Sequence, residues 1–281
     1  MIIGVIGLGL IGGSLAMALG NFEGARIFGV DRSAQTRAQA MARATVYAAY
    51  EDAGDAPLED ADVIILCLHP EASVAFVKEH AARLKPGAVL TDVCGVKKTL
   101  VETIDAYLPE GRAFIGGHPM AGRECGGFAN ATGALFQGAH YIVVPTARTT
   151  PEAYDLLRRM IRCMGCADMI ETDVKTHDLR IAYTSQMMHV LALAICDQEQ
   201  LIPSKGFEGG SFRAATRVAA LDAKLWTELF WANREALLDQ TRELIGKLSE
   251  YAALLEGDDR EALYARLEES AARKHAYNRL E

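Results

Sequence analysis

The chain has 281 residues, half of them hydrophobic and 23% charged, and its formal net charge is −8. A chain of this length can form two domains, each with its own core. The acidic balance argues against nucleic acid or an anionic membrane as a partner, because both are bound by basic surfaces. An anionic substrate would therefore need a local cationic site.

The N-terminal half alternates between short apolar runs and segments with helical spacing. Runs rich in β-branched residues predict strands, and the segments between them predict helices. The predicted strands are 2–7, 25–31, 61–68, 87–93, 113–116, 140–145 and 167–172. The predicted helices are 10–19, 34–44, 71–84 and 151–165. This order is typical of α/β proteins with a Rossmann-type, mostly parallel sheet covered by helices on both faces.

From Asp173 onwards the sequence predicts helices only, over 173–200, 209–256 (with a break near Leu221) and 258–280. We therefore expect a dinucleotide-binding domain at 1–171 and an all-helical domain at 172–281. The first of these helices is apolar around too much of its circumference for a surface helix. This pattern favours burial between the subunits of a homodimer, and the alternative is a core helix of one subunit.

A glycine-rich loop joins the first predicted strand to the first predicted helix. Its sequence, "GLGLIG", places Gly7, Gly9 and Gly12 in a G-x-G-x-x-G pattern. In this pattern the first glycine permits a tight turn, the second lets a pyrophosphate approach the backbone, and the third lets helix and strand pack closely. Leu10 and Ile11 begin the helix, whose free N–H groups bind phosphate. We therefore expect a bound dinucleotide.

An acidic residue follows the second predicted strand, where dinucleotide-binding folds bind the adenosine ribose. Asp31 favours NAD because a carboxylate repels the 2′-phosphate of NADP, whereas the neighbouring Arg32 could accommodate that phosphate and keeps NADP as the alternative. Leu68 and His69 follow the third predicted strand. We expect them to form the lip of the cofactor site.

The composition and the cysteine spacing limit other classes of site. The six cysteines do not form a disulfide framework, and only Cys163 and Cys166 form a C-x-x-C pair. No second ligand pair has the spacing of a metal site, so we expect no metal. We find no membrane-spanning run and no leader with a cleavage site, and we expect a reduced, cytoplasmic protein without membrane contact.

The stretch "FIGGHPMAGRECGG" contains a histidine just after a predicted strand. His118 follows the strand at 113–116. Ligands of parallel sheets bind beyond the carboxyl ends of the strands. That position would let His118 act as a general base beside a nicotinamide. The alternative is a structural histidine in a turn.

Several motifs together resemble the prephenate/arogenate dehydrogenase family. They are "GHPMAGRECGG", "TDVCGVK", "HDLRIAYTSQMMHVLALAI" and "GGSFRAATRVA", and the resemblance covers nearly the whole chain. Members of this family oxidise prephenate to 4-hydroxyphenylpyruvate, or arogenate to tyrosine, with loss of carbon dioxide. The resemblance implies a monofunctional NAD-dependent enzyme of tyrosine biosynthesis. It also implies a 6-phosphogluconate-dehydrogenase-like fold, in which the helical domain dimerises.

The resemblance also implies roles for individual residues. His118 takes the proton of the ring hydroxyl as hydride leaves for the nicotinamide, and Arg217 holds a substrate carboxylate. His189 reaches the site from the helical domain, although a satisfied core histidine is the alternative. Glu124 lies at the mouth of the site, and Arg213 is a second candidate for anion binding.

The chain departs from the family pattern at three positions. Gly95 stands at the substrate site where many members carry serine, so another group or a water has to orient His118. Gln186 stands where histidine is common, and Ala214 stands where an acid is common. No residue decides between prephenate and arogenate, and we expect prephenate.

Two other readings compete with this one. A β-hydroxyacid dehydrogenase has the same layout but uses a lysine on the long helix, and here only Lys175 lies at the start of that helix. A non-catalytic dinucleotide sensor is consistent with Gly95. The presence of both His118 and Arg217 argues against such a sensor.

Overall fold

A computed structural model describes residues 1–123 and 125–280. The chain divides into two compact units, Met1–Arg234 and Glu235–Glu281. The first unit contains all the strands of the described residues and the helices up to Ala232, and the second unit is helical. The domain boundary expected at 171–172 stays a prediction.

One sheet of eight strands forms the centre of the first unit, in the order β3-β2-β1-β4-β5-β6-β7-β8. Its strands are β1 (Ile2–Ile6), β2 (Arg26–Val30), β3 (Ala48–Tyr50), β4 (Val63–Leu66), β5 (Val89–Asp92), β6 (Ala113–Pro119), β7 (His140–Pro145) and β8 (Asp168–Glu171). Neighbouring strands run parallel except β6 and β7, which are antiparallel. The sequence did not predict the short strand β3.

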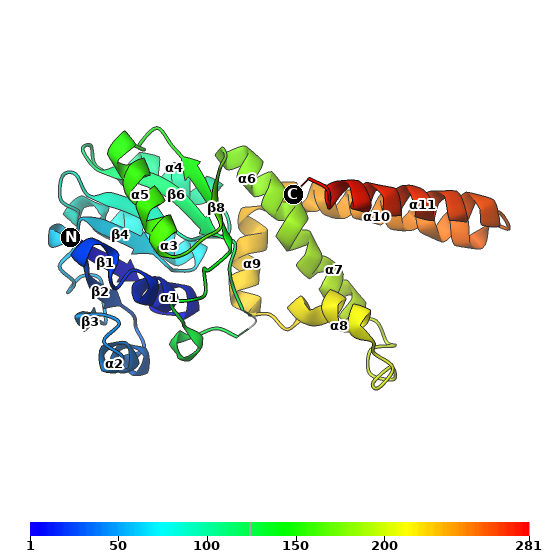
Figure 1. Ribbon diagram of the computed structural model, residues 1–281, viewed down its shortest axis with the longest axis horizontal. Helices are drawn as coiled ribbons and strands as arrows, with labels where there is room; N and C mark the ends of the chain where they lie inside the picture. The colour runs from blue at the N-terminus through cyan, green and yellow to red at the C-terminus, as the bar shows by residue number, and fades with distance from the viewer. Residues whose placement is uncertain (124, 281) are drawn as a thin grey trace. The chain divides into compact units, whose positions relative to one another are not determined.

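Helices cover both faces of this sheet (Figure 1). They are α1 (Leu10–Ala18), α2 (Ala34–Ala42), α3 (Pro70–His80), α4 (Lys98–Tyr107) and α5 (Pro151–Cys163). Alternate residues of each strand point to opposite faces. Ile65 therefore packs in one apolar cluster with α1 and α5, whereas Ile64 packs in the other with α3 and α4.

The rest of the chain is helical, as the sequence predicted. The helices are α6 (Val174–Ile181), α7 (Met187–Cys196), α8 (Gly210–Thr216), α9 (Ala223–Ala232), α10 (Arg234–Glu256) and α11 (Arg260–Tyr277). A π-helical turn, Ala182–Gln186, joins α6 to α7. Short 3₁₀ turns occur at Phe22–Gly24, Leu58–Asp60, Ala81–Arg83, Phe128–Asn130 and Arg217–Ala219.

The continuous helical stretch Val174–Cys196 departs from one expectation. By length and composition it could cross a membrane, with a mean hydropathy of 1.2 over its most apolar window. The sequence analysis found no such run. Only 28% of that window is buried in the single chain. The stretch also carries the buried polar residues His177, Asp178 and Gln186, which bond to His118, Lys97 and Asn233 in other parts of the fold.

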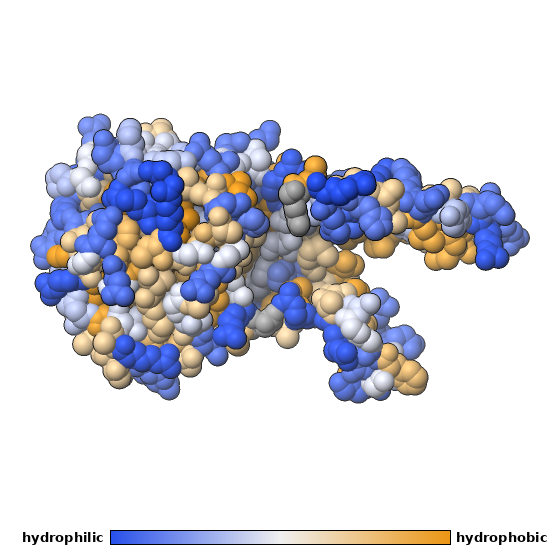
Figure 2. All heavy atoms as spheres, in the orientation of Figure 1, coloured by the Kyte–Doolittle hydropathy of each residue, from blue (hydrophilic) through white to orange (hydrophobic). Residues whose placement is uncertain are grey.

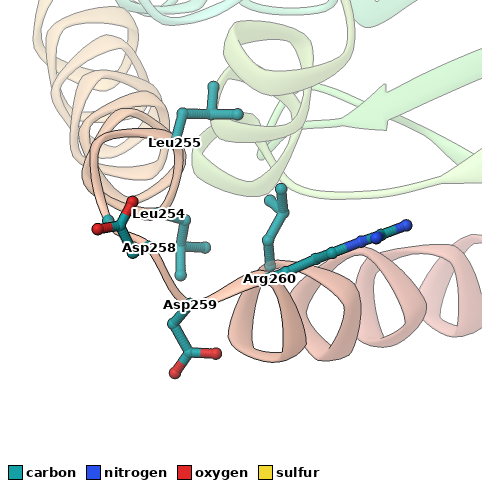
Figure 3. A pocket seen from close by; sticks show the side chains of 7 residues that line it. Leu254, Leu255, Asp258, Asp259 and Arg260 are labelled. Atoms are coloured by element: carbon teal, nitrogen blue, oxygen red, sulfur yellow. The ribbon is translucent and has the colours of Figure 1, made fainter.

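The second unit is a hairpin of α10 and α11. The Tyr251 hydroxyl lies 2.8 Å from Ser270 Oγ across the two helices. Leu254, Leu255 and Asp259 are among the residues that line a shallow pocket at the hairpin turn (Figure 3). The Asp259 carboxylate accepts from the backbone of Ala262, so it caps α11. Figure 2 shows apolar side chains exposed along this hairpin.

Candidate active site

The glycine loop between β1 and α1 has the shape that a dinucleotide requires. Gly7 has a φ of 93°, and a Cβ there would lie 2.4 Å from the carbonyl oxygen of Cys67. A Cβ on Gly12 would lie 1.9 Å from the carbonyl oxygen of Gly7. A Cβ on Gly9 would meet nothing within 4 Å. The loop therefore packs tightly on the protein side at Gly7 and Gly12 and leaves open space for a pyrophosphate at Gly9.

The first turn of α1 faces that open space. Gly9 is the N-cap residue, and Leu10 and Ile11 follow as the first two helical residues. The first turn contains no acidic residue among the described residues. The N–H groups and the positive end of the helix dipole suit an anion.

Asp31 lies at the end of β2 beside this loop. One of its carboxylate oxygens accepts from Leu8 N at 2.9 Å, and the other accepts from Ser33 N at 2.8 Å. The Arg37 guanidinium donates to the backbone oxygens of Asp31 and Arg32 at 2.8 and 2.9 Å. These bonds fix the orientation of the Asp31 carboxylate at the end of β2, beside the glycine loop. The bonds from Arg37 stabilise this turn, and the sequence analysis did not identify Arg37.

The β4–α3 connection forms the lip opposite the glycine loop. The Leu68 side chain reaches within 3.0 Å of where a Gly7 Cβ would be, and His69 is the N-cap of α3. Glu228 of α9, whose side chain is 8% exposed, accepts from Glu71 N at 3.2 Å. Its other oxygen lies 3.7 Å from His69 Nδ1. Glu228 thus joins α9 to the connection between β4 and α3. No motif in the sequence indicated this contact.

His118 lies within β6, paired with Ile142 of β7, and not in a turn after the strand. The strand is longer than predicted because β7 pairs with it as far as Pro119. A Cβ on Gly95 would lie 3.9 Å from His118 Nε2. Burial, with contributions from Lys97 and His177, holds the pKa of His118 well below its ordinary value. The imidazole is therefore neutral at physiological pH, as a proton acceptor must be.

A second histidine contacts the first. His118 Nδ1 lies 3.0 Å from His177 Nε2, and His177 Nδ1 lies 2.7 Å from Asp178 Oδ1. The His177 side chain is fully buried. Burial lowers its pKa, although the hydrogen bond to Asp178 opposes this shift. His177 thus holds the His118 ring through a side-chain contact, which Gly95, without a side chain, does not offer. The dipeptide "HD" at 177–178 was the sequence feature that could have indicated this contact. Its distance from His118 in the sequence gave no reason to pair the two histidines.

A buried ion pair fixes the loop between β5 and α4. Lys97 Nζ lies 2.7 Å from Asp92 Oδ2, and both side chains are fully buried. Asp92 also accepts from the backbone N–H groups of Cys94 and Gly117. These bonds satisfy the buried carboxylate and hold Gly95 beside β6.

His189 and Arg217 line one pocket of about 340 Å³, a size typical of small-molecule sites. The His189 ring stacks on Trp226 of α9 at a centroid distance of 3.5 Å. His189 Nδ1 lies 3.0 Å from the Ser185 carbonyl oxygen. Burial lowers the pKa of His189, and this hydrogen bond opposes the shift. Arg213 is not among the residues lining this pocket, and it donates to the backbone oxygen of Glu208.

Helix α9 connects that pocket to the surroundings of His118. Trp226 contacts His189, and one turn later a Leu229 methyl lies 3.5 Å from where a Gly95 Cβ would be. Gln186, in the π-helical turn, donates to the backbone oxygen of Leu229 and accepts from Asn233. Gln186 is therefore a buried structural amide.

Three expectations concern residues outside these clusters. Glu124 lies outside the described residues. Within 1–123 and 125–280 the structure holds no group of three or more His, Cys, Asp or Glu side chains that could bind a metal. Cys163 and Cys166 are free thiols, and Cys163 Sγ lies 3.7 Å from the Ala18 carbonyl oxygen, which is consistent with packing.

Comparison with known proteins covers most of the chain. Residues 15–169 match the family model described as prephenate dehydrogenase, nucleotide-binding domain. Residues 173–269 match the model described as prephenate dehydrogenase, dimerization domain. The chain is 31% identical over 268 residues to prephenate dehydrogenase of Bacillus subtilis, covering 92% of this chain and 71% of that protein.

Solved structures have the same fold. Arogenate dehydrogenase from Synechocystis superposes with a TM-score of 0.82 at 28% identity, over 99% of this chain and all of that one (100%). Prephenate dehydrogenase from Aquifex aeolicus, solved in complex with hydroxyphenyl propionate and NAD+, superposes with a TM-score of 0.88. At 24% identity, over 99% of this chain and 98% of that one, the second likeness concerns the fold alone.

Proposed function

Since the chain belongs to the prephenate dehydrogenase family, we propose that it oxidises prephenate to 4-hydroxyphenylpyruvate with release of carbon dioxide, using NAD as the hydride acceptor. The observation that carries this proposal is a neutral, oriented imidazole, His118, in the fold that the family shares. Its Nε2 faces the space beside Gly95.

The chain's own residues supply proton transfer and orientation. His118 Nε2 accepts the proton of the ring hydroxyl as the C–H bond on the same carbon breaks. NAD, when bound, supplies the acceptor for that hydride. The C–C bond to the ring carboxylate then breaks, its electron pair makes the ring aromatic, and the proton on His118 returns to the oxygen as the phenol forms. A pKa held below the ordinary histidine value keeps the base free to accept.

Arg217 is the cation that we assign to a substrate carboxylate. It lines the same pocket as His189, whose ring stacks on Trp226 of α9. A guanidinium binds a carboxylate through two parallel hydrogen bonds, which fixes the orientation of the substrate as well as adding affinity. A net charge of −8 makes such a local cation necessary for a dianionic substrate.

The glycine loop and Asp31 fit NAD. The open space at Gly9 suits the pyrophosphate, and the Asp31 carboxylate suits the ribose hydroxyls and repels a 2′-phosphate. We assign Leu68, His69 and Arg32 to the rim of this cofactor site.

Arogenate is the second candidate substrate, because the arogenate dehydrogenase from Synechocystis shares the whole fold at 28% identity. Arogenate carries an ammonium group where prephenate carries a ketone. Steady-state assays of the purified protein with each substrate and each cofactor test the proposal. Turnover of prephenate with NAD supports it, and preferential turnover of arogenate replaces prephenate by the second candidate. Absence of turnover with both substrates rejects the proposal.

We also propose a homodimer formed through the helical part. Only 28% of the most apolar window of Val174–Cys196 is buried in the single chain, and Phe207 and Trp231 are 89% and 69% exposed. A second copy of the chain would cover such a surface. Light scattering of the purified protein tests this, and a monomer at micromolar concentration would reject it.

A further inference from the structure

The contact between His118 and His177 raises the question of which nitrogen of His118 carries its proton. We propose that Asp178 and His177 are positioning residues that fix His118 as the Nδ1–H tautomer, with its lone pair on Nε2 facing the reacting hydroxyl. The inference rests on the proposed function, because it assigns His118 as the base. It goes further by naming the two residues that determine which nitrogen accepts the proton.

The direction of each hydrogen bond follows from Asp178. Its Oδ1 accepts from Lys97 N at 2.9 Å, and its Oδ2 accepts from Lys98 N at 3.0 Å, at the start of α4. Backbone N–H groups only donate, so both carboxylate oxygens act as acceptors. His177 Nδ1, 2.7 Å from Oδ1, must therefore donate.

The second step concerns the two imidazoles. A neutral imidazole has one N–H and one lone pair. With its proton on Nδ1, His177 presents a lone pair at Nε2, 3.0 Å from His118 Nδ1. Only an N–H on His118 Nδ1 satisfies that contact. The lone pair of His118 is then on Nε2, which lies 3.9 Å from the place of a Cβ on Gly95.

The charged groups around His118 are compatible with this assignment. The charge of Lys97 helps to lower the pKa of both histidines, and its ammonium is paired with Asp92. The neighbouring Cys94 thiol is neutral, since burial raises its pKa to about 11. When His118 accepts a proton at Nε2, its Nδ1–H remains bonded to His177. The Asp178 carboxylate beyond it stabilises the imidazolium through that ring.

The experiment combines a spectrum with a matched set of variants. Long-range ¹H–¹⁵N correlation of histidine-labelled protein without substrate identifies the tautomer of each ring. His177→Leu removes the acceptor, whereas His177→Gln offers a side-chain carbonyl that can still accept from His118 Nδ1. The control is His140→Leu, because His140 and Asp168 form an exposed pair on neighbouring strands with a similar contact of 2.5 Å.

We expect the Nδ1–H tautomer at His118 in the wild type and in His177→Gln, and its loss in His177→Leu. The kcat of His177→Leu should fall by about 10²–10⁴-fold, the usual contribution of a general base, while KM stays within twofold. His177→Gln should recover part of the loss, and His140→Leu should match the wild type. If His177 had only a structural role, His177→Leu would not change the tautomer of His118, and His177→Gln would not restore kcat together with that tautomer.

The wild-type spectrum is decisive even where the leucine variant does not fold. An Nε2–H tautomer at His118 overturns the inference, and so does an unchanged kcat in a folded His177→Leu. An Nδ1–H tautomer in a protein that oxidises neither prephenate nor arogenate supports the inference and rejects the proposed function. The two claims therefore fail separately.

Discussion

Glu228 tests how α9 is held against the start of α3, where its carboxylate contacts Glu71 and His69. Its nearly buried carboxylate accepts from Glu71 N at 3.2 Å, within the first turn of α3. A carboxylate at a helix N-terminus is stabilised by the free N–H groups and by the helix dipole. His69, the N-cap, lies 3.7 Å from the same side chain. Glu228→Ala should therefore destabilise the fold, and Glu228→Gln, which keeps one acceptor oxygen, should do so less.

The magnitude follows from the burial of the group. A partly buried charge at a helix end contributes up to about 2 kcal/mol. For a protein of this size, that loss corresponds to a fall in Tm of roughly 4–8 °C. Differential scanning calorimetry of Glu228→Ala and Glu228→Gln measures it. Glu243→Gln, on the exposed surface of α10, is the control and should change the free energy of unfolding by no more than about 0.5 kcal/mol. A Tm for Glu228→Ala equal to that of the control would refute the reasoning.

Three further predictions concern the binding sites. Gly9→Ala should fold, because a Cβ there meets no protein atom, but it should lose NAD affinity, because that Cβ would enter the space for the pyrophosphate. Gly12→Ala should destabilise the fold, because its Cβ would lie 1.9 Å from the Gly7 carbonyl oxygen. Calorimetry and NAD titration distinguish the two variants, and equal effects would contradict the loop geometry. Arg217→Ala should raise the KM for substrate by the equivalent of about 2–5 kcal/mol if the ion pair is desolvated; an unchanged KM in steady-state assays would move the carboxylate site elsewhere. Asp31→Asn keeps an acceptor for Leu8 N but loses the charge, so the affinity for NADP relative to NAD should improve by about 1 kcal/mol; an unchanged ratio of dissociation constants would deny Asp31 its role in cofactor choice.

Local sequence signals predicted most of the fold. Seven of the eight strands follow from apolar runs and turn residues, because buried parallel strands are short and rich in β-branched residues. The exception is β3, whose three residues, Ala48–Tyr50, carry too short a pattern. The end of β6 was also placed too early. Its last residues are held by antiparallel pairing with β7, a long-range contact that local periodicity does not encode.

The roles of the site residues stay predictions, and the structure shows contacts among them that the sequence did not predict. The glycine spacing predicted the loop between β1 and α1, where a Cβ on Gly7 or Gly12 would clash with backbone atoms and a Cβ on Gly9 would not. The contacts of His177 and Glu228 depend on elements far apart in the chain. No spacing rule brings His177 to His118, or Glu228 to the start of α3. Gln186 illustrates the same limit, since its bonds to Leu229 and Asn233 are revealed only by the folded chain.

The pH dependence of kcat/KM for prephenate with NAD tests the central claim, a neutral His118 that accepts the substrate proton, most directly. The base is active when unprotonated, so activity should be lost as the pH falls through the pKa of His118. Because that pKa is held below its ordinary value of 6.5, kcat/KM should stay level through neutral pH and fall only in more acidic solution. His118→Asn should lack this acid limb and lose about 10²–10⁴-fold in kcat. An identical acid limb in His118→Asn, or a rate that rises as the solution becomes acidic, would contradict the account.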